Sequence, residues 1–270
     1  MNETRNLAVF CDFENVALGV RDAKYEKFDI SRALEKLLLK GSIVVKKAYC
    51  DWDRYKEFKS AMHAAAFELI EIPHRNQSGK NSADIRMVVD ALDLCYTKEH
   101  VDTFVIVSGD SDFSPLVSKL RENAKTVIGV GVKNSSSDLL ISNCDEFIYY
   151  DDLVREDEAK RRAARKRRES RPAGVPKEAA AGDDKKQEAF DLVLETVQAL
   201  VAERGEGERI WGSMVKQALK RRKPGFNESY YGFKAFSDLL EELRERKLLA
   251  LELDEKSGGY LIRPAGAATD

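Results

Sequence analysis

The chain has 270 residues, enough for one large domain or two smaller ones with buried cores, and its formal net charge is only −2. This charge balance singles out no partner, and no apolar stretch is long enough to span a bilayer, so a membrane protein is not expected. The four cysteines include no CxxC pair, which argues against a zinc site or a disulfide framework. Together with the polar N-terminus, they favour a cytoplasmic protein with free thiols.

Residues 1–150 alternate between short apolar runs and segments of helical periodicity. The apolar runs, expected to be strands, are residues 7–11, 43–50, 68–72, 103–108, 126–132 and 146–150. The periodic segments, expected to be helices, are residues 29–40, 55–67, 82–96, 113–122 and 137–142. This alternation predicts an α/β fold with a doubly wound parallel sheet, covered by helices on both faces. Ligands of such sheets bind beyond the carboxyl ends of the strands.

The composition changes after this first segment and divides the chain. We expect a first domain at residues 1–152, a charged linker rich in Pro, Ala and Gly at 153–184, a second small domain at 185–264 and a tail at 265–270. The basic block at residues 160–171 is either a phosphate-attracting stripe or a solvated spacer. Three helical segments followed by a hairpin over residues 248–263 predict a winged-helix-like second domain.

Acidic residues follow two of the predicted strands. Asp12 comes directly after the first strand, with Asn15 three residues later, and Asp110 and Asp112 follow the fourth. Taken singly, an aspartate at such a place is typical of a turn or helix cap. The first and fourth strands of a doubly wound sheet commonly lie side by side, however, so these carboxylates are expected to share one cleft.

A further carboxylate, Asp84, lies in the first turn of the long helix over residues 82–96. At about 100° per residue it aligns with Val88, Ala91 and Cys95 at the edge of the buried face. Asp90 and Asp93 fall on other sides of the helix and are expected to face solvent. Asp84 is therefore expected to lean toward the same cleft.

Four carboxylates and an amide without His or Cys suit a hard divalent cation, most simply Mg²⁺ or Mn²⁺. Such an ion lowers the pKa of a bound water and stabilises a phosphoryl group during in-line displacement. The pattern thus favours nuclease chemistry.

Three stretches, "FCDFENV", "GKNSADIRMVVDAL" and "VIVSGDSDFSPLVSKLRE", closely resemble the NYN domain of the PIN-like ribonuclease superfamily. The resemblance covers about residues 5–150. It implies a Mg²⁺- or Mn²⁺-dependent endoribonuclease that hydrolyses RNA phosphodiesters with an activated water. It also implies metal ligation by Asp12, Asp84, Asp110 and Asp112, with Asn15 as a polar helper.

Weaker RNA-binding candidates surround these residues. Arg75, Lys80 and Arg86 lie before and within the start of the 82–96 helix, where they are either contacts to an RNA backbone or parts of a solvated loop. Ser108 and Ser111 are suited to hydrogen-bond phosphate or a neighbouring carboxylate, but serine beside glycine is also ordinary in a turn.

The C-terminal stretch "FNESYYGFKAFSDLLEEL" resembles the OST-HTH (LOTUS) domain, which implies RNA binding or a protein contact. RNA-facing candidates there are the basic cluster at a predicted helix end and one tyrosine: Lys220, Arg221, Arg222, Lys223 and Tyr230. The sequence leaves open whether this domain binds RNA or protein, and whether the chain forms homo-oligomers.

Two alternatives to a ribonuclease remain. A non-catalytic RNA-binding adaptor would keep the same fold without turnover. A phosphohydrolase of the haloacid-dehalogenase type would use Asp12 as a nucleophile, but it needs a second aspartate two residues later, where this chain has Glu14.

Overall fold

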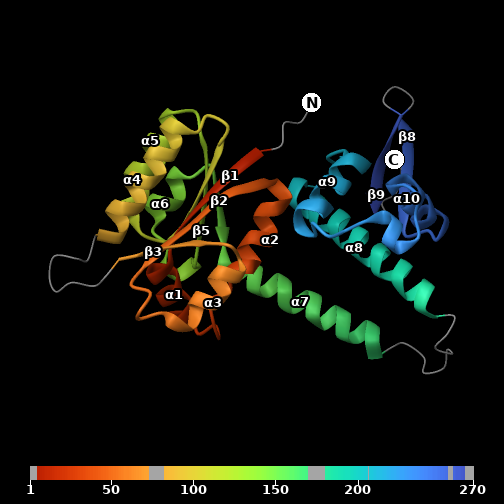
Figure 1. Cartoon of the computed structure of the whole chain (residues 1–270), viewed down its shortest axis with the longest axis horizontal. Helices are drawn as coiled ribbons and strands as arrows, with labels where there is room; N and C mark the ends of the chain where they lie inside the picture. Colours follow the sequence, from red (N-terminus) through yellow and green to blue (C-terminus); the bar gives the residue numbers. More distant parts are fainter. Residues whose placement is uncertain (1–4, 73–81, 170–179, 206, 255–257, 265–270) are drawn as a thin grey trace. The chain divides into compact units, whose positions relative to one another are not determined.

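The structure is a computed structural model that describes residues 5–72, 82–169, 180–205, 207–254 and 258–264 (Figure 1). The chain divides into two units, Met1–Ser170 and Arg171–Asp270, and each is described by itself.

The first unit is built on a six-stranded sheet. Its strands are β1 (Arg5–Asp12), β2 (Gly41–Cys50), β3 (Glu68–Glu71), β4 (Thr103–Val107), β5 (Thr126–Gly131) and β6 (Glu146–Tyr149). All neighbours run parallel, in the order β3-β2-β1-β4-β5-β6, which confirms the predicted doubly wound sheet. The order of the strands reverses between β1 and β4, and in this class of sheet the ligand crevice lies at such a point.

Seven α-helices accompany this sheet within the described residues: α1 (Phe13–Asp22), α2 (Ile30–Lys40), α3 (Lys56–Ala64), α4 (Ser82–Thr97), α5 (Ser114–Glu122), α6 (Asp138–Asn143) and α7 (Tyr150–Glu169). Two 3-10 turns, η1 (Ser111–Phe113) and η2 (Lys133–Ser135), follow β4 and β5. The sequence reading missed α1, which follows β1 without a loop and has only ten residues. None of the helices in the described parts of the chain is long and apolar enough to cross a membrane.

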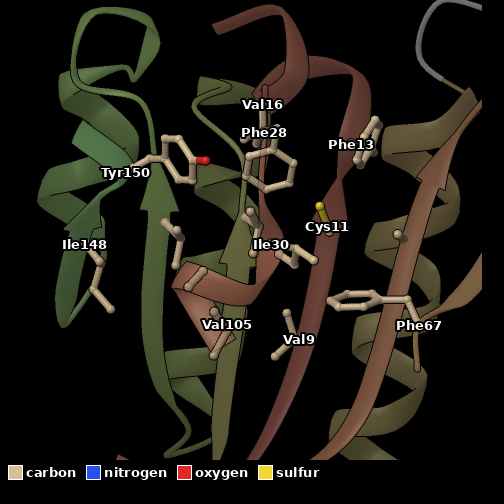
Figure 2. Close-up of a cluster of buried hydrophobic side chains, with 14 of the residues drawn as sticks. Val9, Cys11, Phe13, Val16, Phe28, Ile30, Phe67, Val105, Ile148 and Tyr150 are labelled. Atoms are coloured by element: carbon tan, nitrogen blue, oxygen red, sulfur yellow. The ribbon is translucent and has the colours of Figure 1, made fainter. Parts of the chain in front are cut away.

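Side chains of β1 alternate between two core layers. Val9 and Cys11 enter one layer with Phe13 of α1 and Phe28 and Ile30 near α2, as Figure 2 shows. Ala8 and Phe10 enter the other layer, which receives Met87 and Ala91 from α4 and Leu116 and Val117 from α5. Both faces of the sheet are therefore buried, and this explains why the strands are continuous apolar runs.

Helix α7 starts as part of the first unit. Leu153 and Val154 are buried in the core, and the Asp151 carboxylate accepts hydrogen bonds from the Tyr25 hydroxyl (3.0 Å) and the Lys133 backbone N–H (2.8 Å). The domain boundary expected at residue 152 therefore lies inside a helix that continues to Glu169.

The second unit packs three helices against a small sheet. Its elements are α8 (Ala180–Arg204), β7 (Ile210–Trp211), α9 (Gly212–Arg222), η3 (Glu228–Tyr231), α10 (Phe236–Glu245), β8 (Leu249–Asp254) and β9 (Gly259–Pro264). Strand β9 pairs antiparallel with both β7 and β8, so the predicted hairpin gains a short third strand. The core comes from one stripe of each helix, with Phe190 and Val193 from α8, Val215 from α9 and Leu239 from α10.

Candidate active site

A pocket of about 240 Å³ opens at the carboxyl ends of β1 to β4. Its lining consists of carboxylates, one amide, one phenol, one thiol and a few apolar side chains: Asp12, Glu14, Asn15, Leu18, Tyr49, Cys50, Asp51, Ile72, Ala83, Asp84 and Asp110. The structure thus brings the neighbouring Asp12 and Asn15 together with Asp84 and Asp110, which lie far from them in the sequence. The pocket occupies the place where doubly wound sheets bind ligands.

Asp12 is the last residue of β1 and the N-cap of α1, with 7% of its surface exposed. Its Oδ1 accepts the backbone N–H of Asn15 (3.4 Å), and its Oδ2 accepts the hydroxyl of Ser108 (2.9 Å). Ser108 follows β4, the neighbour of β1 in the sheet, so this bond joins the two strand ends. Two donors therefore hold the Asp12 carboxylate in one orientation.

The turn after β4 is tied to the same group of residues. The side-chain oxygen of Asn15 accepts the Gly109 N–H (2.9 Å), and the Ser108 hydroxyl accepts the Asp110 N–H (3.2 Å). A Cβ on Gly109 would come within 2.4 Å of the Ser135 carbonyl oxygen, so this close approach requires glycine. The roles of Asn15 and Ser108 seen here are to position the Asp12 carboxylate and the turn that carries Asp110.

The carboxylates of the pocket repel one another. Burial first, and then the charge of Asp84, raise the pKa of Asp12 to about 7, although the hydrogen bonds from Ser108 and Asn15 partly oppose this. Burial and the charges of Asp110 and Asp112 raise the pKa of Asp84 to about 6. Among the described residues, no Lys or Arg lines the pocket, although Arg54 pairs with the lining residue Glu14 at 2.9 Å. A bound cation would relieve this repulsion.

Within the described residues, no three Asp, Glu, His or Cys side chains form a group that could hold a metal ion by themselves. Mg²⁺ commonly binds through one or two carboxylates and keeps several waters, so it does not need such a group. The chemistry of the donors fits the ion: hard oxygen ligands surround a buried carboxylate, and no Lys or Arg is among the described residues that line the pocket.

The sequence reading missed three polar residues of the pocket, Glu14, Tyr49 and Asp51. Asp51 directly follows β2 and Asp12 is the last residue of β1, so an aspartate at the end of an apolar strand was the signal that could have identified it. Glu14 lies in the first turn of α1, and Tyr49 is completely buried in β2.

Asp112 lies apart from the other predicted carboxylates. With Ser111 it lines a separate, larger hollow beside α5 and α6, although its charge still reaches Asp84. Its expected part in a shared metal site therefore stays a prediction, and its position differs from that of Asp110.

The expectation that Asp90 faces solvent is wrong. Its carboxylate accepts the Tyr49 hydroxyl (2.9 Å) and Lys47 Nζ (3.3 Å) from β2, and its side chain is only 11% exposed. Arg86, a predicted RNA contact, pairs with the same carboxylate at 3.0 Å while remaining 56% exposed. On a helical wheel, Asp90 lies away from the face of α4 that packs on the sheet. The side chains of Lys47 and Tyr49 in β2 nevertheless reach it there.

The other RNA-binding candidates have different surroundings. Arg75 and Lys80 lie outside the described residues. Lys220 and Lys223 are exposed, and Arg221 is half-buried. The prediction for Arg222 needs correction: its side chain is 9% exposed, and it contacts Glu195 (2.9 Å) and the Thr196 hydroxyl (3.3 Å), so it stabilises α9 against α8.

Tyr230 is 62% exposed, as a base-stacking residue would need to be. The Lys185 ammonium lies 4.6 Å from its ring centroid, while the neighbouring Tyr231 stacks on Phe226.

The fold and the acidic pocket define a class of α/β protein with its site at the strand ends, and comparison with known proteins identifies the family. Residues 6–151 match the NYN domain, which is more than half of the chain, and the chain belongs to the NYN family. Residues 190–247 match the OST-HTH/LOTUS domain. The first match indicates a nuclease-like fold, and the second indicates an RNA-binding module.

Two relatives illustrate the first unit. An uncharacterized protein of Methanocaldococcus jannaschii, MJ0482, is 28% identical over 120 residues, which cover 44% of this chain and 47% of that protein. The chain thus spans about half the length of this curated relative. The crystal structure of a protein of unknown function from Vibrio parahaemolyticus, VPA0982, is similar with a TM-score of 0.51 and 28% identity, over 57% of this chain and 97% of that one.

Proposed function

We propose that the chain is an endoribonuclease that depends on Mg²⁺ or Mn²⁺ and hydrolyses RNA phosphodiesters with an activated water. The NYN unit would carry the reaction, and the OST-HTH unit would bind RNA. The observation that carries the proposal is the pocket at the strand ends, where Asp12, Asp84 and Asp110 converge without a cationic side chain among the described residues.

This pocket repels RNA as long as its carboxylates are uncompensated, because a phosphodiester is also an anion. Asp12, Asp84 and Asp110 would share the divalent ion, one or two of them by direct ligation and the rest through waters that the ion keeps. When bound, the ion would supply a water of lowered pKa and stabilise negative charge on the phosphoryl group.

The chain's own residues orient the site. Ser108 and the Asn15 backbone hold Asp12, while the Asn15 side chain holds the Gly109 amide ahead of Asp110. These bonds fix two carboxylates relative to each other before substrate arrives, and such preorganisation favours catalysis.

The test uses the purified chain of 270 residues and a labelled RNA that contains single-stranded and hairpin segments. We expect internal cleavage with Mn²⁺ or Mg²⁺, none with EDTA, and a loss of at least about a thousandfold in rate for Asp110→Asn. Asp93→Asn is the matched control, because Asp93 is an exposed aspartate on α4 that does not line the pocket.

Equal cleavage by Asp110→Asn and the wild-type protein would refute the assignment of the site. Tight RNA binding without cleavage in either metal would instead support the RNA-binding adaptor.

A further inference from the structure

An open hollow of about 650 Å³ lies beside the candidate active site. Its walls come from η1, the start of α5 and helix α6, and they include Ser111, Asp112, Ser114, Pro115, Leu139 and Asn143. Asp110 lines the acidic pocket and Asp112 lines this hollow, so one short turn separates the two. A strand of RNA at the acidic pocket would therefore have a neighbouring nucleotide within reach of the hollow.

Ser114, in the wall of the hollow, has an unused hydroxyl. It is only 6% exposed, and its Oγ has no hydrogen-bond partner among the residues that the structure describes. Buried hydroxyls are normally hydrogen-bonded, and an unpartnered one destabilises the fold unless a water or ligand meets it. The wall of the hollow thus contains one polar group that has no hydrogen-bond partner among the described residues.

The chemistry of the lining selects the kind of ligand. No Lys or Arg is among the described residues that line the hollow, and the Asp112 carboxylate would repel a phosphate. Leu139, whose surface is 56% exposed, and Pro115 offer apolar contact area, while hydroxyls, an amide and a carboxylate supply hydrogen-bonding groups. An apolar face with a polar edge is the character of a nucleobase, and proteins that read single-stranded RNA bind unstacked bases in this way.

The hollow is held at a fixed place relative to the acidic pocket. The Ser137 N–H, at the start of α6, donates to the Gly109 carbonyl oxygen at 2.9 Å, and the Ser137 hydroxyl caps α6 by accepting the Leu139 N–H. Leu139 is thereby tied to the turn that carries Asp110 and Asp112. A ligand in the hollow would therefore be held at a fixed position relative to the phosphodiester in the acidic pocket.

We infer that this hollow is a subsite for the nucleobase of a nucleotide next to the cleaved phosphodiester. The inference rests on the proposed function, and it adds a recognition element that the acidic residues do not provide. Leu139 and Pro115 contact the face of the base, and Asn143 or Asp112 bonds its edge, together with the Ser114 hydroxyl once its side chain rotates toward the hollow.

The experiment uses a set of identical short RNAs in which each position in turn carries an abasic nucleotide. For the wild-type protein with Mn²⁺, we expect an abasic residue at one position beside the cut to raise KM about tenfold, with little change in kcat. With intact RNA, Leu139→Ala and Ser114→Ala should raise KM to a similar extent. In these variants the abasic substitution should raise KM little further, because the protein substitution and the abasic nucleotide remove the same contact.

Val89→Ala is the matched control, because Val89 on α4 is also 56% exposed and lines neither hollow. The substitution at the exposed Leu139 should leave the fold intact, which keeps the test valid even if Ser114→Ala destabilises the protein. The inference is overturned if every abasic position is equivalent, or if Leu139→Ala behaves like Val89→Ala.

A failure of the proposed function has a different signature. If the wild-type protein cleaves none of these RNAs with either metal, the same set is titrated against the protein in EDTA, and affinity is measured by fluorescence anisotropy. A weaker affinity for one abasic RNA that disappears in Leu139→Ala would keep the subsite without the nuclease. Equal affinities throughout would reject the subsite as well.

Discussion

Two aspartates of the first unit differ because of their neighbours. Asp12 is buried among other carboxylates, and its pKa is raised to about 7. Burial alone would also raise the pKa of Asp90, but the Tyr49 hydroxyl and the Lys47 charge lower it below its usual value. The ionised Asp12 carboxylate is therefore destabilised, and a bound cation or a proton would stabilise it. The charge of Asp90 is already compensated within the protein.

The raised pKa values predict how the stability of the metal-free protein depends on pH. Asp12 and Asp84 bind protons more tightly in the folded protein than in the unfolded chain, where an aspartate has a pKa near 3.8. Their contribution to the free energy of unfolding is therefore greatest below about pH 4 and is lost as pH rises through about 6 to 7. Asp84→Asn should remove part of this loss and raise Tm by roughly 3 °C at about pH 8, but not at about pH 4.

Differential scanning calorimetry in EDTA checks this, with the exposed Asp93→Asn expected to match the wild type. Adding Mn²⁺ at about pH 8 should raise the Tm of the wild-type protein more than that of Asp84→Asn, because the ion binds only the folded site. A lower Tm for Asp84→Asn at both pH values would contradict the mutual repulsion inferred for the pocket.

At the scale of elements, the site is assembled from the first turns of helices. Asp12 caps α1, Asp84 lies in the first turn of α4, and Asp110 caps η1. The partial positive charge of a helix N-terminus favours a carboxylate there and offsets part of the repulsion. The orientation of each helix thus helps to stabilise carboxylates that repel one another.

Helix α4 is anchored to β2 through Asp90, six residues beyond Asp84. Tyr49→Phe should lower the free energy of unfolding by about 1 kcal/mol, and Asp90→Asn by roughly 1–3 kcal/mol. Because both changes break the same hydrogen bond, the double variant should lose less than the sum of the two. Urea denaturation at neutral pH measures this, and strict additivity would show that the contact contributes nothing.

The same anchor should respond to acid in the opposite way from the pocket. Since the pKa of Asp90 is lowered in the folded protein, its stabilising contribution is present above the usual aspartate value and is lost as pH falls through the lower folded value. The stability difference between the wild type and Asp90→Asn should therefore shrink toward about pH 3.

At the scale of the whole molecule, the chain joins a nuclease-like unit to an RNA-binding module. If the second unit holds RNA, it raises the effective concentration of substrate at the first, whatever geometry the connection adopts. We propose that Lys220 and Lys223, which are exposed at the end of α9, provide a phosphate contact there.

Lys223→Glu should therefore raise KM for a long RNA about three- to tenfold at low salt, with kcat unchanged, and the effect should fade as salt increases. Lys98→Glu is the control, because this exposed lysine lies just after α4, before the amino end of β4 and away from the pocket. Identical kinetics for the two variants would show that the α9 end does not contact RNA.

Local patterns in the sequence were sufficient to predict most elements of the first unit. The apolar run before Asp12 is β1, and the expected helix over 82–96 is α4. The pattern also placed Asp12, Asp84 and Asp110 near one another, because parallel strands present their carboxyl ends at one edge. Helix α1 was missed because it continues directly from β1 and spans only ten residues.

Which side chains share a cavity, and which are neutralised, was settled only by tertiary packing. Asp51 lines the acidic pocket, whereas Asp112 lines the other hollow. Asp90 and Arg222 form ion pairs within the protein. Periodicity describes the conformation of a segment and the face it buries, and it can be read from neighbouring residues alone. Contacts between segments depend on the register of adjacent strands and the reach of individual side chains, so they appear only once the chain is folded.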